Sequence, residues 1–233
     1  MNQYDTSLAL VAFRLGGVAP DLFLAYEWSG HEAISELYRF EVKLASAQMD
    51  IKLEDHLGRR ATLTVRDQSG RIVRWHGLIT ALRQTHRDET YAYYQAVLEP
   101  QLALLRLFKQ SRVYLHAEAQ RGGDPDLSTV IRAVLEQCGL KNERFDQEDN
   151  ADFEIRISSQ DLAYTRSNFI CQFEETSLNF LQRRLEHAGV YFWFEQGEER
   201  ETIVFASSKE HQPQKVHKLV WRAGLKETQA EQH

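Results

Sequence analysis

LYRFEVKL, residues 37–44, alternates between two kinds of side chain along its whole length. Its even-numbered positions are all aromatic or aliphatic: Tyr38, Phe40, Val42 and Leu44. Three of its odd-numbered positions are charged: Arg39, Glu41 and Lys43. A period of two residues is typical of a strand with one face in a core and the other towards solvent. The stretch therefore predicts a half-buried strand.

Similar patterns on both sides of this stretch predict a region built mainly of strands. The further strands are expected at 8–15, 22–28, 61–66, 71–84 and 91–98, with a short helical turn at 53–57. The last two strands are long and are joined by the polar segment 85–90. Long antiparallel arms with few helical intervals favour a barrel or a strongly curved sheet. We therefore expect a barrel-like domain over residues 1–100, closed by Pro100.

The next hundred residues mix helices and strands. A short helix is expected at 101–108 and a brief strand at 112–115. A longer helix at 125–138 would begin with Asp124 as N-cap and Pro125 in the first turn, and would end before Gly139. A similar helix at 177–188 would begin at Thr176 and end before Gly189. The expected core residues on these two helices are Val134, Leu181 and Leu185.

Three strands and one loop complete this smaller mixed α/β domain at 101–206. Strands are expected at 168–173, 190–194 and 202–206, and an acidic surface loop at 145–152. VYFWF, residues 190–194, is wholly β-branched or aromatic and predicts a strand buried on both faces, Phe192 included. Residues 207–233 form a polar C-terminal segment, apart from 219–221, that could begin a second barrel. The expected fold class is α+β and β-rich.

Composition and charge are those of an ordinary folded protein. The 233 residues are 42% hydrophobic and 27% charged, with a net charge of -6, which suffices for a core without metal or disulfide bonds. No clustered basic run points to nucleic acid as a partner, and Arg183-Arg184 fits a solvated helix face. Cys138 and Cys171 are both expected to be buried, reduced thiols, with a disulfide left as an alternative.

The chain carries no pattern that directs it to a membrane. Its N-terminal residues lack a basic leader, and no apolar run approaches the ~18–20 residues of a membrane helix. We therefore expect no membrane anchor and no N-terminal signal peptide. The protein is expected in the cytoplasm at assembly.

A search for catalytic patterns nominates no residue as catalytic, cofactor-binding or metal-binding. There is no GxSxG, HExxH or GxxxxGK[ST] motif, and Gly122-Gly123 before a helix is a weak phosphate signal. The nine histidines are dispersed, and His76 in a long strand is interpreted as structural or exposed. The carboxylate pairs Glu174-Glu175 and Asp124/Asp126 fit helix starts. The chain is therefore predicted not to be an enzyme.

Four stretches together resemble one family. LYRFEVKL looks like a strand found early in VgrG proteins and phage late-control D proteins. LGRRATLTVRDQSGRIVRWHGLIT (57–80) and PQLALLRLFKQSRVY (100–114) are similar to the segments that follow it. CQFEETSLNFLQRRLEHAGVYFWFE (171–195) is similar to the family's most distinctive signature, a capped helix, a glycine and an aromatic strand. The resemblance covers about residues 8–206, in the family's order.

The resemblance implies a phage tail hub-like fold and a structural role in protein secretion. In that family, this region belongs to the baseplate hub of a type VI secretion system spike, or of a phage tail. The hub is a homotrimer that joins a hexameric tube of Hcp-type subunits to the piercing needle. Other baseplate proteins and effectors would be further partners, and the machine would inject the protein without a signal peptide. No cofactor is implied.

Two departures from the family pattern stand out. The connection 117–126 and the acidic stretch 145–159 differ from what the family leads us to expect. Family members also continue into a second barrel and a needle, so we expect a chain of this length to self-associate weakly. The alternatives are a phage or phage-like tail hub and, in another class, a peptidoglycan hydrolase carried on a tail hub, which would need paired titratable groups in a cleft.

Overall fold

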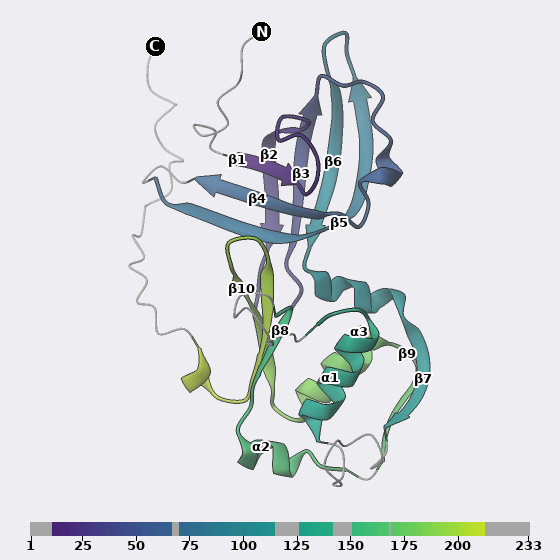
Figure 1. Cartoon of the computed structure of the whole chain (residues 1–233), viewed down its shortest axis with the longest axis vertical. Coiled ribbons are helices and arrows are strands. Elements are labelled where there is room, and N and C mark those ends of the chain that lie inside the picture. The colour runs from purple at the N-terminus through teal and green to yellow at the C-terminus, as the bar shows by residue number, and fades with distance from the viewer. Residues whose placement is uncertain (1–10, 67–69, 115–125, 142–150, 168, 213–233) are drawn as a thin grey trace, which may run out of the picture.

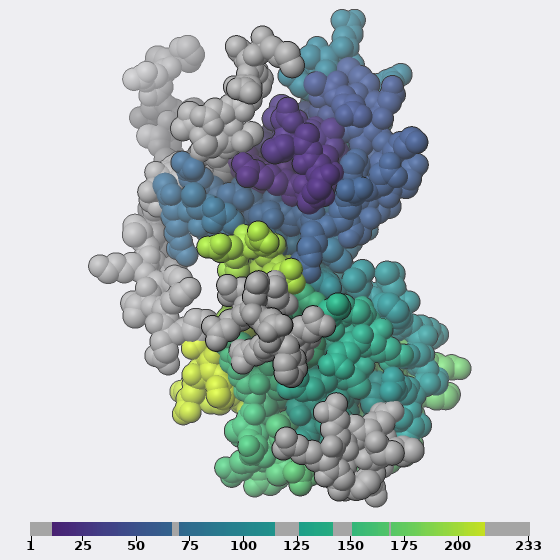
Figure 2. Space-filling model, in the orientation of Figure 1, coloured from purple at the N-terminus to yellow at the C-terminus, as the bar shows by residue number. Residues whose placement is uncertain are grey.

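The computed structural model describes residues 11–66, 70–114, 126–141, 151–167 and 169–212. Residues 11–99 form a lobe that we call the barrel lobe, and the described residues from 101 to 212 form the α/β lobe below it (Figure 1). Figure 2 shows the two lobes stacked along the long axis of the molecule. The β-rich α+β fold class is therefore confirmed.

The barrel lobe is one curled antiparallel sheet of six strands. In chain order they are β1 (Val11–Leu15), β2 (Leu24–His31), β3 (Arg39–Ser46), β4 (Arg60–Arg66), β5 (Ile72–Arg87) and β6 (Ala92–Glu99). Their order across the sheet is β1-β4-β5-β6-β3-β2. The two outer strands, β1 and β2, still contact each other because the sheet curls back on itself. A short 3-10 turn, η1 (Leu53–Asp55), lies between β3 and β4.

Alternation along the strands sets the core of this lobe. Tyr38, Phe40, Val42 and Leu44 are all buried, while Arg39 and Lys43 are exposed, as the alternation predicts. Gly77 permits a close approach of two strands, because a Cβ there would lie 2.3 Å from the Glu99 carbonyl oxygen. No side chain fits at that distance, so any substitution would force β5 away from the end of β6.

The α/β lobe holds two small sheets and three α-helices. The elements are η2 (Gln101–Leu107), β7 (Lys109–Tyr114), α1 (Leu127–Gln137), β8 (Phe153–Arg156), α2 (Ser159–Tyr164), β9 (Ile170–Thr176), α3 (Ser177–His187), β10 (Tyr191–Gln196), β11 (Glu201–Ala206) and η4 (Lys209–His211). One sheet has the order β10-β11-β8 and the other pairs β7 with β9. Helix α3 contacts η2, β9 and α1. No helix in the described ranges is long and apolar enough to cross a membrane.

Helix α3 agrees with its sequence pattern. The Thr176 side chain accepts a hydrogen bond from the Asn179 backbone N at 3.1 Å, which caps the helix start. Gly189 follows the helix end with φ of +65°. The expected core positions Val134, Leu181, Leu185 and Phe192 are all buried. Cys138 is buried as predicted, Cys171 is half-buried, and both cysteines are free.

Helix α2 was not predicted, and four further details differ from the sequence prediction. Helix α1 is capped by Asp126, which accepts from the Thr129 backbone N at 2.9 Å; the expected cap Asp124 and Pro125 lie outside the described residues. Residues 151–153, assigned in part to the acidic loop, are buried and lead into the unpredicted strand β8. Glu174 and Glu175 lie in β9, not at a helix start.

The fourth difference concerns the aromatic strand β10. Phe192 and Phe194 are buried, whereas Tyr191 and Trp193 are half-buried. β10 is an outer strand of its sheet within the described chain, with β11 as its ladder partner. An aromatic run was interpreted as buried on both faces, but here one aromatic face is partly open to solvent.

Candidate functional site: the junction between the lobes

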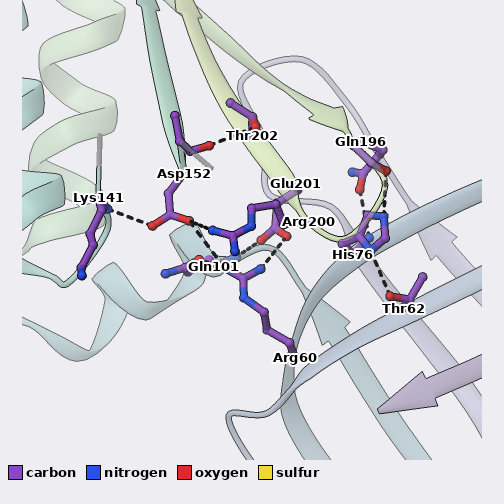
Figure 3. A network of polar contacts seen from close by, with 12 residues as sticks. Arg60, Thr62, His76, Gln101, Lys141, Asp152, Gln196, Arg200, Glu201 and Thr202 are labelled. Atoms are coloured by element: carbon purple, nitrogen blue, oxygen red, sulfur yellow. Dashed lines mark hydrogen bonds and ion pairs between the residues drawn. The ribbon is translucent and has the colours of Figure 1, made fainter. Parts of the chain in front are cut away.

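Arg60 on β4 reaches from the barrel lobe into the α/β lobe (Figure 3). Its Nη1 lies 3.2 Å from Glu201 Oε2, and its Nη2 donates to the Gln101 side-chain oxygen. Glu201 begins β11 and its side chain is 1% exposed. The second oxygen of Glu201 accepts the backbone N–H of Gln101 at 2.8 Å. One buried carboxylate thus joins β4, the start of η2 and β11.

Asp152 extends this network towards the helices. Its Oδ1 lies 3.6 Å from a guanidinium nitrogen of both Arg60 and Arg200. Its Oδ2 accepts the Lys141 backbone N–H at 2.8 Å, just after helix α1. Its own backbone carbonyl accepts from Ile203 N at 3.0 Å. Asp152 therefore fixes the end of α1 to β11 and shares the charge of Arg60 with Glu201.

His76 on β5 forms a second connection, to the turn between β10 and β11. Its backbone N–H donates to Gln196 Oε1 at 2.9 Å. Its Nε2 lies 3.1 Å from the Gly197 carbonyl, which can only accept, so Nε2 carries the proton. Its Nδ1 is then free to accept from Thr62 Oγ1 at 2.9 Å. The hydroxyl of Tyr38 donates to the His76 carbonyl.

The electrostatics of His76 agree with this arrangement. Burial lowers the pKa of His76, although its hydrogen bond to the Gly197 carbonyl opposes that effect. The ring is therefore neutral at pH 7, with one nitrogen as donor and the other as acceptor. A ring whose two nitrogens are both engaged inside the protein is a structural link, which is one of the two readings that the sequence left open.

Glu99, at the end of β6, fixes the polypeptide where it passes between the lobes. Its carboxylate, 4% exposed, accepts from Thr80 Oγ1 at 2.6 Å and from Arg106 Nη1 at 2.9 Å. Arg106 belongs to η2, so the carboxylate holds η2 against the sheet. Pro100 separates the two elements. The three buried carboxylates of the junction are thus all neutralised by arginines of the same chain.

The junction is a structural contact between the two lobes, because its carboxylates and its histidine already bond to other groups of the protein. Its carboxylates are engaged by guanidinium groups and backbone N–H groups, and its histidine by a carbonyl and a hydroxyl. Among the described residues, no group of three or more His, Cys, Asp or Glu side chains could hold a metal ion; His116, His217 and His233 lie outside them. The absence of catalytic, cofactor and metal residues stays a prediction.

Sequence reasoning missed Arg60, Asp152 and Glu201. Arg60 lies just before the predicted strand 61–66, while Asp152 and Glu201 fell in segments interpreted as a loop and a polar turn. The apolar run that follows Thr202 predicted the strand 202–206 but gave no sign that the strand begins one residue earlier with a buried acid. His76 was noticed, and the structure places it at the same junction.

Comparisons with curated proteins point to one group. The chain is 27% identical to the Pseudomonas aeruginosa "Type VI secretion system spike protein VgrG1b" over 179 residues, which are 77% of this chain and 21% of the relative. It is 29% identical to VgrG5 of the same organism over 205 residues, 87% of this chain and 23% of the relative. A Vibrio cholerae protein named "Actin cross-linking toxin VgrG1" is 23% identical over 74% of this chain and 14% of the relative. The chain spans about a quarter or less of these relatives.

Solved structures share the fold. The Escherichia coli c3393 protein, described as a component of the type VI secretion system with structural similarity to the T4 tail proteins gp27 and gp5, matches 85% of this chain and 49% of that chain, with a TM-score of 0.66 and 22% identity. The 43 kDa tail protein of prophage MuSo2 from Shewanella oneidensis matches 83% of this chain and 52% of that chain, with a TM-score of 0.51 and 14% identity.

The sequence resemblance is confirmed at the level of the family. The family described as "Phage tail baseplate hub (GPD)" matches residues 31–233. This range contains β3 to β11 and every residue of the junction, and it leaves out β1 and all of β2 except His31. The chain belongs to the phage tail baseplate hub family.

Proposed function

We propose that this chain is the hub part of a type VI secretion spike of the VgrG kind, and that its work is mechanical. The spike would join a tube of Hcp-type subunits to the needle, and the hub would be a homotrimer. Other baseplate proteins and effectors would be its further partners. The machine would assemble in the cytoplasm and export the protein without a signal peptide.

The observation that carries this proposal is the junction itself. A hub must keep its parts in register while a contracting sheath pushes on it, so relative motion of its lobes has to be costly. Here Arg60, Glu201 and Asp152 link the lobes through buried, paired charges. Removing one member would leave a buried charge uncompensated, which is far more costly than breaking an exposed ion pair. We propose that the barrel domain, 1–100, and the α/β domain, 101–206, act as one rigid unit.

A phage or phage-like tail hub is the closest alternative; the likeness to a prophage tail protein, at 14% identity, shows only that the fold is shared. The two roles share the same mechanics and differ in the machine. The genes next to this one distinguish them: a sheath, a tube and an ATPase of a secretion system support the first, and capsid and tail genes support the second.

Assembly on a tube is the test of this function. The chain is expected to show a weak, concentration-dependent equilibrium between monomer and trimer. A closed ring needs two complementary surfaces on each subunit, and we expect the second barrel of family members to supply one of them. It is also expected to sediment with the hexameric tube protein of the same cell. Analytical ultracentrifugation with and without the tube measures both. A stable dimer, or sedimentation unchanged by the tube, would contradict the proposal.

We also propose that the chain has no catalytic activity, which sets the peptidoglycan hydrolase aside. A hydrolase needs a cleft with paired titratable groups, and the carboxylates of Glu201, Asp152 and Glu99 are already engaged by arginines. Purified protein is expected to release no product from peptidoglycan, peptide, nucleotide or glycoside substrates, and to contain no stoichiometric metal by elemental analysis. Turnover, or one metal ion per chain, would overturn this.

A further inference from the structure

An open groove of about 1030 Å³ runs between β5 of the barrel lobe and the β10–β11 hairpin. The apolar side chains that line it include Ile34, Ile72, Trp75 and Trp193, and polar and charged side chains line the rest. Ile34 is 60% exposed and Ile72 is 41% exposed. When several apolar side chains around one groove are exposed to solvent to this extent, the surface is typically one that another polypeptide segment covers.

The last described residues of the chain lie in the same groove. His211 and Gln212 both line it. Arg156 Nη1 donates to the His211 carbonyl at 3.2 Å, and Gln212 Nε2 donates to the Tyr191 hydroxyl at 3.2 Å. Arg156 is itself held by Glu195 and lies over the Trp193 ring, 5.7 Å from its centroid. Side chains of β8 and β10 therefore hold residues 211 and 212 at the groove.

The segment that follows carries a short apolar run. Residues 213–233 read PQKVHKLVWRAGLKETQAEQH, and their longest apolar run is Leu219–Trp221. The run begins seven residues after Gln212. Because an extended chain spans roughly 3.3 Å per residue, it can reach about 23 Å from Gln212. Attachment at the mouth of the groove also gives the run a high effective concentration there.

We propose that Leu219–Trp221 binds in this groove of its own chain, against Ile72, Trp75 and Trp193. Apolar contact drives the binding, since the run Leu219–Trp221 carries no charge while the charged side chains that line the groove are of both signs: Glu32, Glu195, Arg71, Arg74 and Arg156. The tether favours the chain's own segment over that of a second copy. Bound there, the segment fixes the direction in which the polypeptide leaves the two lobes. This inference does not depend on the proposed function.

Hydroxyl-radical footprinting of the full chain tests the proposal. In Val220→Asp, the side chains of Ile72, Trp75 and Trp193 are expected to oxidise roughly threefold faster or more, because losing one buried side chain of this size weakens binding by about tenfold. Gln229→Asp adds the same charge outside the apolar run and should leave these rates unchanged. Tyr164, 82% exposed and outside the groove, is the internal reference.

A second variant tests the groove from the other side. Ile72→Asp places a charge on an exposed wall position and is expected to raise oxidation of Trp221. Equal rates at Ile72, Trp75 and Trp193 in the wild type and Val220→Asp would overturn the proposal. So would protection that disappears on dilution, because the segment of a second copy would then fill the groove. Both readouts come from the free chain, so a failure to bind the tube leaves them unaffected.

Discussion

Replacing Arg60 with Met is expected to lower the free energy of unfolding by about 2–3 kcal/mol. Removing one partner of a buried ion pair costs about 3–5 kcal/mol, and we reduce that range because the Arg60 side chain is 35% exposed and therefore partly screened. The change removes the guanidinium that bonds Glu201, whose side chain is 1% exposed and keeps the Gln101 N–H at 2.8 Å. Urea denaturation followed by circular dichroism measures the loss.

A double-mutant cycle identifies the buried charge as the cause. Glu201→Gln keeps the shape and the acceptor for Gln101 but removes the charge, so it should recover part of the stability lost in Arg60→Met. Arg83→Met is the matched control, because Arg83 is exposed and bonds only to Gln95 among the contacts described; it should change stability by less than about 0.5 kcal/mol. Additive losses in the cycle would show that Arg60 acts through packing and not through Glu201.

Local sequence patterns predicted the elements that are determined by residues within the same strand or helical turn. The alternation at 37–44 places its even-numbered side chains in the core because successive Cβ atoms of a strand point to opposite faces. The cap at Thr176 and the glycine at 189 mark α3 because both act on the backbone within one turn. The cap of α1 was misplaced by two residues, because Asp124 and Asp126 are both chemically able to cap and the sequence does not rank them.

Strand β8 could not be predicted from local sequence patterns. It has only four residues, FEIR, and two of them are charged, so no apolar alternation marks it. Arg156 bonds Glu154 of the same strand at 2.7 Å, and it bonds Glu195, 39 positions away, at 2.8 Å. Its pairing with β11 is parallel and joins residues about fifty positions apart. A strand that depends on such partners cannot be read from its own residues.

The junction was hidden from the sequence for the same reason. Arg60 and Glu201 are 141 positions apart, and each alone fits an ordinary surface residue at the end of a strand. The aromatic run at 190–194 led to the opposite error, because too much burial was predicted. Aromatic content indicates burial but not which face of the strand is covered. Tyr191 and Trp193 instead lie beside Arg156 and the groove. Local patterns predicted the fold class, whereas the junction consists of residue pairs that are distant in the sequence.

Replacing Leu181 with Ala is expected to cost about 2–5 kcal/mol of stability, the range for emptying a large side chain from a packed core. Leu181 lies on the buried face of α3, which packs against η2, β9 and α1, and it is 1% exposed. Several elements share this contact, so none can move inward alone to fill the cavity. Glu186→Ala, on the exposed face of the same helix, should change stability by less than about 0.5 kcal/mol. Equal effects of the two substitutions in urea denaturation would mean that α3 does not present Leu181 to the core, and that the apolar spacing used to orient the helix is misleading.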